Sequence, residues 1–139
     1  MYFIKDVLLI ESVQRKFTKR IPGFNSLSYG ERLKTLNMIS LERRRLETDL
    51  TMCFKILNGL VSGPPESYGL NISNRQSRGH SFKLIIEQPK VDVRKFFFAN
   101  RVAKPWNALP QSVVDSNSIG QFKRRLREIN LQNYLYIKV

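Results

Sequence analysis

The sequence predicts a mainly α-helical fold: a small helical domain with a long Gly/Pro-containing loop and one or two short β-strands near residues 81-98. Three observations support this fold class. Apolar residues recur at helical spacing in several segments, Ser-x-x-Glu/Gln patterns mark two helix starts, and four glycines and a proline pair lie within residues 58–80. With 139 residues, 42% of them hydrophobic, the chain is long and apolar enough for one domain with a modest core.

A first helix is predicted between Asp6, which can cap its start, and the Pro-Gly pair after residue 21, which would end it. Its apolar residues at helical spacing are Ile10, Val13, Phe17 and Ile21. Its other face carries Arg15, Lys16, Lys19 and Arg20. Because cations in a last turn also suit the helix dipole, this basic face is either simply solvated or a phosphate-contacting surface. Ser28 and Glu31 then form the capping-box pattern of a short second helix through about Leu36.

A third helix is predicted from Ser40, a capping residue, to Gly59, which can end it. The apolar residues that share one face of this helix are Leu46, Leu50, Cys53 and Leu57. Its first turns contain Arg43, Arg44 and Arg45, where cations oppose the helix dipole. Local helix stability therefore does not explain these arginines, whereas pairing with nearby acidic residues or with an external anion would.

Residues 58–80 are predicted to form a long connection, because glycines and the Pro64-Pro65 pair disfavour a long helix or a central strand. In the segment that follows, Phe82, Leu84 and Ile86 alternate with other residues until Pro89. This alternation predicts one short strand, paired with residues near Val91 or Phe97.

The stretch FFFANRVAKPWNALPQSVV, residues 96–114, contains three phenylalanines and Trp106 among cations and prolines. Aromatic residues can stack on unpaired bases only when exposed, and they are more often buried, so we expect Phe96 to Phe98 and Trp106 to pack in the core. Pro105 removes a backbone donor, which predicts that any helix here is kinked or restarts at the proline. Trp106 and Leu109 are expected to anchor this bend, which Pro110 ends.

The last predicted helix begins at Ser118, which forms a second capping-box pattern with Gln121. Its apolar face contains Ile119, Phe122, Leu126 and Ile129, and its other face contains Lys123, Arg124 and Arg127. As one small domain, the chain is divided into residues 1-57 (helical part), 58-80 (flexible connection) and 81-139 (short strand, aromatic segment and basic helix).

The chain is strongly basic, with 24 Lys and Arg against 11 Asp and Glu and a formal charge of +13. Such a surface attracts polyanions, and nucleic acid is the first partner to consider. No apolar run approaches the ~20 residues needed to span a bilayer, and the N-terminus lacks the pattern of a signal peptide. We therefore expect an intracellular protein, nuclear or cytoplasmic and not secreted, without a membrane role.

Catalytic and metal-binding patterns are missing from the sequence. The chain has a single cysteine, Cys53, and a single histidine, His80, which cannot build a disulfide or a zinc cluster within one chain. Acidic residues are scattered, without the acidic pair typical of two-metal phosphoryl transfer, and there is no Gly-rich phosphate loop. We expect no cofactor, a core position for Cys53 and a surface or turn position for His80.

One resemblance involves most of the chain. The ordered segments VQRKFTKRI, YGERLKTLNMISLERRRLETDL, CFKILNG, SRGHSFKL, FFFANRVAKPWNALPQSVV and SIGQFKRRL resemble the region downstream of the polymerase domain in reverse transcriptases of non-LTR, LINE-type retrotransposons. The resemblance extends from about Glu11 to Leu131. It implies a C-terminal piece of an RNA-directed DNA polymerase, one encoded by a truncated copy of the mobile element. The polymerase and endonuclease sites lie upstream in that family, so no catalytic residue is carried over.

The sequence thus predicts a non-catalytic fragment that binds RNA or DNA without sequence preference through basic helical faces. The candidate contact residues are Arg15, Lys16, Lys19, Arg20, Arg43, Arg44, Arg45, Lys123, Arg124 and Arg127. The alternative is an interaction scaffold that packs on a polymerase thumb, supplied in trans, with no nucleic-acid role of its own. An exposed patch rich in Phe or Leu would favour this alternative.

Overall fold

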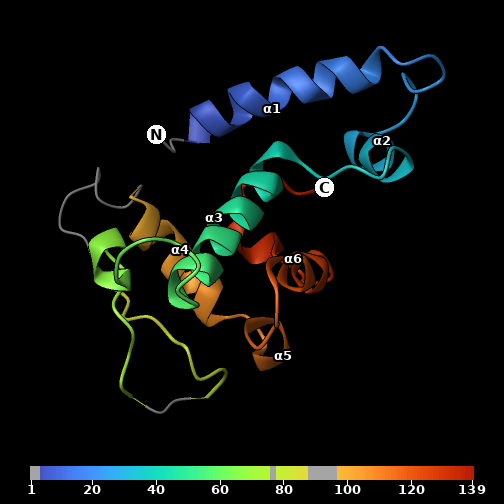
Figure 1. The fold of residues 1–139 in the computed structure, drawn as a ribbon. Coiled ribbons are helices and arrows are strands. Elements are labelled where there is room, and N and C mark those ends of the chain that lie inside the picture. Colours follow the sequence, from blue (N-terminus) through green and yellow to red (C-terminus); the bar gives the residue numbers. More distant parts are fainter. Residues whose placement is uncertain (1–3, 76–77, 88–96) are drawn as a thin grey trace. The chain divides into compact units, whose positions relative to one another are not determined.

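The computed structural model describes residues 4–75, 78–87 and 97–139 and confirms a mainly helical fold (Figure 1). The chain divides into two compact units. Unit 1 comprises residues 1–45 and 131–139, and unit 2 comprises residues 46–130. The elements in chain order are α1 (Ile4–Lys19), α2 (Tyr29–Thr35), α3 (Leu41–Leu57), the 3-10 helix η1 (Pro65–Tyr68), α4 (Phe98–Asn107), α5 (Gln111–Val114), α6 (Ile119–Arg127) and η3 (Gln132–Tyr134).

The helix starts in unit 1 follow the predicted capping chemistry. The Ser28 hydroxyl accepts a hydrogen bond from the Glu31 backbone amide, and the Glu31 carboxylate accepts one from the Ser28 amide, which completes the capping box of α2. Ser40 caps α3, since its hydroxyl accepts from the Arg43 amide at 3.1 Å. These caps supply partners for amides that the first helical turn leaves unpaired.

The apolar face of α1 is not the buried one. An amphipathic helix normally turns its apolar stripe to the core, but Val13 and Phe17 are each 68% exposed and Ile10 is also exposed. The buried side chains of α1 are instead Val7, Glu11, Gln14 and Thr18. The apolar residues whose spacing predicts this helix therefore lie on its exposed side, and Asp6 lies within the first turn and not before it.

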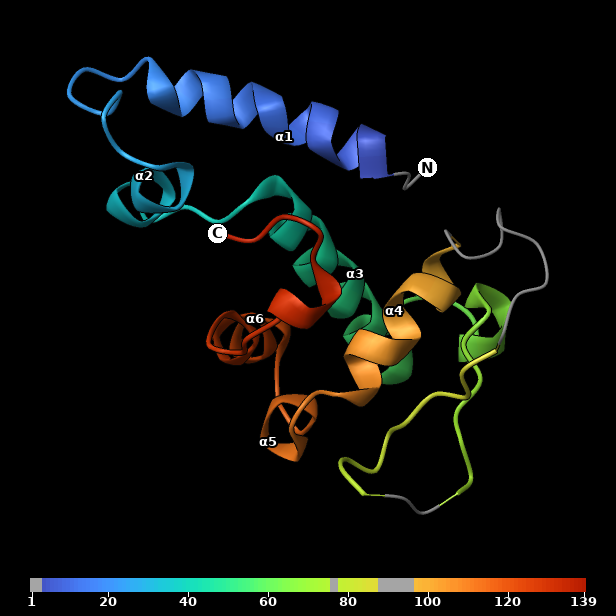
Figure 2. The ribbon, with the colours of Figure 1, turned by 180° about the vertical axis from the view of Figure 1, so that it is seen from behind.

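The C-terminal residues of unit 1 were not expected to contribute to packing. Leu131, Leu135 and Ile137 are buried, and the Ile137 amide donates to the Glu42 carboxylate at 3.0 Å. This bond places the end of the chain beside the first turn of α3 (Figure 2). The alternation of Leu135 and Ile137 in an otherwise polar segment was the available sequence signal.

Unit 2 has an aromatic core. Phe54 of α3 stacks on Phe122 of α6 with ring centroids 4.4 Å apart, and Trp106 of α4 lies 6.0 Å from Phe122. All three side chains are almost fully buried, together with Leu50 and Cys53. Offset aromatic pairs of this kind add to the apolar area that they bury. The predicted apolar faces of α3 and α6 thus form this core, and Phe54 adds a residue that the sequence pattern did not single out.

The aromatic stretch agrees only in part with its prediction. Trp106 is fully buried, whereas Phe98 is half-buried, Phe97 is 54% exposed and Phe96 lies outside the described residues. Of the two predicted outcomes at Pro105, a restart is wrong, since α4 runs through this proline as one helix, and a kink stays a prediction. Pro110, predicted to end this bend, comes two residues after the C-terminal cap Ala108 of α4 and is the N-terminal cap residue of α5.

Residues 58–75 and 78–80 form turns, bends and η1. Gly59 and Gly69 adopt positive φ angles, which glycine accepts without a Cβ penalty, and Gly59 follows the end of α3 as predicted. No strand occurs among residues 81–87, the described part of the predicted strand before residue 97. Leu84 forms an isolated antiparallel bridge with Ile72, and Val91, one predicted partner, lies outside the described residues.

Candidate nucleic-acid interface

The candidate residues of α1 are solvent-exposed. Lys16 and Lys19 lie in its last turn, and Arg20 follows directly. Arg15 is also exposed, and its guanidinium lies 4.5 Å from the ring centroid of Tyr29. A cation stacked on an aromatic ring keeps its charge while its conformations are restricted. These four residues form a positively charged segment that the structure, like the sequence, places at one end of α1.

The three arginines of α3 lie in its first turns, as predicted, where Arg44 is exposed and Arg43 and Arg45 are half-buried. All three take part in contacts within the chain. Arg44 is the most accessible of the three for an external anion.

The candidates on α6 belong to unit 2. Lys123, Arg124 and Arg127 are exposed, and Arg127 forms an ion pair with Glu47 of α3 at 2.9 Å. A second ion pair, between Arg101 and Asp49 at 3.0 Å, joins α4 to the same helix. Arg127 thus has a structural role that sequence reasoning did not foresee, and Lys123 and Arg124 carry the accessible charge of this face.

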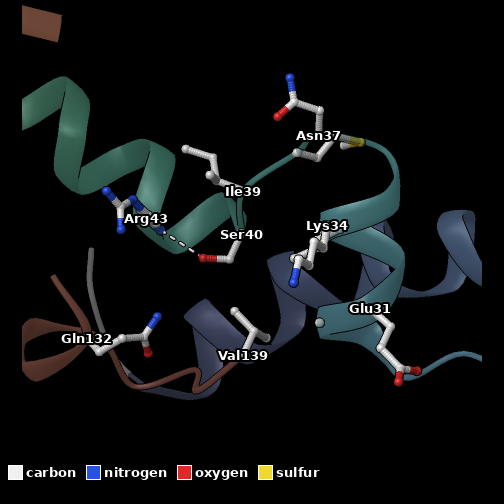
Figure 3. A pocket seen from close by; sticks show the side chains of 11 residues that line it. Glu31, Lys34, Asn37, Ile39, Ser40, Arg43, Gln132 and Val139 are labelled. Carbon is white, nitrogen blue, oxygen red and sulfur yellow. Dashed lines mark hydrogen bonds between the residues drawn. The ribbon is translucent and has the colours of Figure 1, made fainter. Parts of the chain in front are cut away.

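An open hollow of about 540 Å³ lies in unit 1 among α2, the start of α3 and the C-terminal residues (Figure 3). Lys34 and Arg43 line it, together with Ser40, Gln132 and Val139. In Figure 3 the Glu31 side chain points away from the other labelled groups. Lys34 and Arg43 give the hollow a positive potential, which extends the basic surface of unit 1.

A buried polar network fixes the inner face of α1. The Glu11 carboxylate accepts from the amides of Leu41 and Glu42 at 3.1 and 3.2 Å, at the start of α3, and from the Tyr29 hydroxyl. Gln14 donates to the Tyr29 hydroxyl at 2.9 Å. A carboxylate at a helix start is favoured by the helix dipole and satisfies unpaired amides.

Arg32 completes this network at the other end of α1. Its guanidinium donates to the Thr18 hydroxyl at 3.0 Å and to the carbonyls of Leu27 and Arg15 at 2.8 and 3.1 Å. The residue is 4% exposed, so this cation stabilises the packing of unit 1 and is not available to a ligand. Burial, followed by the hydrogen bond to Glu11, raises the pKa of Tyr29 to about 12.

In unit 2, Trp106 and Asn107 hold the extended segment 80–84. The Trp106 indole donates to the Phe82 carbonyl at 2.8 Å. The Asn107 side chain accepts from the Leu84 amide at 2.7 Å and donates to the Leu84 carbonyl at 2.8 Å. This pairing satisfies both backbone groups of Leu84. The tryptophan segment is thus a packing element that secures a loop.

His80 belongs to the same arrangement. It lies in an irregular segment, but it is buried, so the predicted surface position is wrong. Its Nε2 donates to the Trp106 carbonyl at 2.8 Å, and its Nδ1 accepts from the Phe82 amide at 3.1 Å. Burial lowers the pKa of His80 below its ordinary value, because the charged form is desolvated. Both ring nitrogens have structural partners, so the neutral imidazole works as a clamp.

Cys53 occupies the core as predicted, and burial raises the pKa of its thiol. Within residues 4–75, 78–87 and 97–139, no three His, Cys, Asp or Glu side chains gather in a way that would hold a metal ion. Among the same residues, no helix has the length and apolar character to cross a membrane.

No family model, curated protein or solved structure matches this chain. The resemblance to retrotransposon reverse transcriptases therefore stays a hypothesis that rests on the quoted sequence segments.

Proposed function

We propose that this protein binds RNA or DNA through phosphates, without base preference and without catalysis of its own. One observation carries the proposal: Lys16, Lys19 and Arg20 are exposed together at the end of α1. Flexible ammonium groups bind phosphates as point charges. Their binding releases counterions from the nucleic acid, and this release drives association. The formal charge of +13 adds a long-range attraction for any polyanion.

The sequence resemblance supports a biological setting for this activity. We propose that the chain is a C-terminal piece of a non-LTR retrotransposon reverse transcriptase. In that setting it holds template RNA or target DNA near a polymerase domain supplied in trans. Arg44, Lys123 and Arg124 supply further accessible contacts, whereas Arg127 contributes only the charge left by its pairing with Glu47.

A titration of single-stranded RNA and DNA at two salt concentrations tests the binding. The triple variant Lys16→Gln, Lys19→Gln, Arg20→Gln is compared with the control Lys55→Gln, Lys83→Gln, Lys104→Gln, which removes the same charge from unit 2. The first variant is expected to bind more weakly and to lower the slope of log affinity against log salt by about two. Equal effects of both variants would exclude a dedicated α1 contact, and affinity that ignores salt would remove the phosphate mechanism.

The exposed apolar face of α1 favours a second candidate function, that of an interaction scaffold. Leu9, Val13 and Phe17 are solvent-exposed, and the buried side of the same helix is mostly polar. Apolar surface of this kind is typical of sites that bind another protein. The apolar side chains of this face are not among the candidate phosphate contacts, so substitutions there can separate the two functions.

A further inference from the structure

One row of large apolar side chains on α1 is solvent-exposed. Leu9, Val13 and Phe17 follow each other at four-residue spacing, and they are 69%, 68% and 68% exposed. Residues four apart form a continuous ridge along a helix, the kind of ridge that enters a groove on a facing helix. We call these three residues the α1 ridge.

α1 cannot turn this ridge inward without breaking its polar network. Glu11 caps the start of α3, Gln14 donates to Tyr29, and Thr18 accepts from Arg32. Each of these groups would lose a buried partner if the helix rotated, and buried polar groups without partners are costly. The packing of unit 1 thus fixes the α1 ridge on the outside.

The charge beside the ridge identifies the kind of partner. Lys16 lies in the neighbouring row of α1, Arg20 directly follows the end of the helix, and both are exposed. Eleven of the 24 basic residues and four of the 11 acidic residues lie in unit 1, an excess of seven cations. A second copy would bring like charges together, whereas a partner with acidic side chains would pair with them.

The apolar side chains of the ridge favour a protein over a nucleic acid as the binding partner. Leu9 and Val13 are aliphatic and offer no flat surface for stacking a base, which aromatic side chains provide. An amphipathic helix, with apolar residues at three- and four-residue spacing, matches such a ridge along its length.

We propose that the α1 ridge binds an amphipathic helix of a protein partner whose flanking side chains are acidic. The apolar face of the partner packs on Leu9, Val13 and Phe17, and its carboxylates face Lys16 and Arg20. The inference deepens the scaffold candidate above and rests on it. It shares Lys16 and Arg20 with the proposed phosphate contacts, whereas the apolar ridge belongs to the scaffold candidate alone.

The test uses the full chain and three labelled peptides of about 20 residues, a length that supports helix formation. The first has leucines on one face and glutamates on the other, the second replaces glutamate with lysine, and the third replaces leucine with serine. Only the first is expected to bind in fluorescence anisotropy. The variant Val13→Ser, Phe17→Ser should weaken it at least about tenfold, and Lys16→Gln, Arg20→Gln should weaken it more at low salt than at high salt.

The matched control is Leu60→Ser, which removes an exposed apolar side chain of unit 2 and should leave peptide binding unchanged. Thermal melts keep the result interpretable, because substitutions on an open ridge should not lower the melting temperature. The proposal is overturned if the acidic and basic peptides bind equally or if Val13→Ser, Phe17→Ser binds normally. It is equally overturned if the ridge instead mediates self-association in sedimentation or binding to anionic lipid vesicles. In the variant Val13→Ser, Phe17→Ser, which keeps every basic side chain, loss of peptide binding with an unchanged nucleic-acid titration separates this inference from the phosphate-binding function.

Discussion

The inner surface of α1 and the core of unit 2 are stabilised by opposite chemistry. Around Trp106, Phe54 and Phe122, burial removes aromatic surface from water, and few polar groups need partners. Under α1, buried Glu11 and Gln14 are held by directional hydrogen bonds. Apolar periodicity therefore identifies the inner face of a helix only where the neighbouring elements are also apolar, as in unit 2 and not under α1.

The largest expected effect in this comparison is at Trp106. Trp106→Ala should lower the free energy of unfolding by about 3–5 kcal/mol, because it opens a cavity in the aromatic core. It also removes the hydrogen bond to the Phe82 carbonyl. Urea denaturation followed by circular dichroism measures the change. Phe97→Ala, at an exposed aromatic position of the same unit, is the control, and an equal loss there would contradict the assigned core.

A smaller but distinct loss is expected when the polar network under α1 is broken. Glu11→Gln replaces one acceptor oxygen by a donor beside the amides of α3, so the free energy of unfolding should fall by about 1–3 kcal/mol. The pKa of Tyr29 should also fall from about 12 toward 10, since the Glu11 hydrogen bond helps to raise it. Tyrosinate absorbance against pH follows this shift, and an unchanged titration would show that the network does not form.

Tyr29 also makes stability depend on alkaline pH. Its folded-state pKa of about 12 lies above the ordinary value of 10.0, so the unfolded chain releases this proton first. Stability should therefore fall as pH rises from about 10 to 12. Tyr29→Phe, measured across the same range, should show a weaker dependence, and an equal one would assign the effect to other groups.

His80 should give a still smaller effect at acidic pH. Its pKa is lowered by burial from an ordinary value of 6.5, so the neutral form stabilises the fold above that pH. Stability is then lost as pH falls below 6.5 toward the folded-state pKa. The loss is limited, because the protonated ring keeps its bond to the Trp106 carbonyl and loses only the Nδ1 acceptor. Denaturation midpoints at several pH values measure it, with His80→Gln as the pH-independent reference.

The smallest effect is expected on the α1 ridge. Leu9→Ser should change the free energy of unfolding by no more than about 0.5 kcal/mol, because the side chain already contacts solvent. A urea titration beside the Glu11→Gln variant compares the two sides of one helix. A larger loss for Leu9→Ser than for Glu11→Gln would reverse the assignment of inner and outer faces.

The sequence predicted where helices begin better than which face of each helix is buried. Ser28, Ser40 and Ser118 start helices as their patterns indicate, since each hydroxyl accepts from an amide within the same short segment. The inner side of α1 depends on Tyr29, Arg32 and the start of α3, which no local pattern reveals. A buried carboxylate such as Glu11 looks like an ordinary surface residue until its distant amide partners are known.

The sequence was enough to predict which residues carry the candidate charges, but not which other residues they contact. Lys16 and Lys19 are exposed, as a basic helical face implies, whereas the pairing of Arg127 with Glu47 joins residues far apart in the chain. The clamp role of His80 escaped notice for the same reason, since Trp106 lies 26 positions away. Long-range partners decide which polar residues are accessible to a ligand.

The paired hydrogen bonds of Asn107 make its side chain hard to replace. One planar group of this length must offer an oxygen to the Leu84 amide and a nitrogen to the Leu84 carbonyl. Deamidation to aspartate would put two acceptors there and set a carboxylate oxygen against a carbonyl. Chemical ageing at this one position would therefore loosen the segment at Leu84, without any change in the encoded sequence, while the bonds of Trp106 to Phe82 and His80 remain.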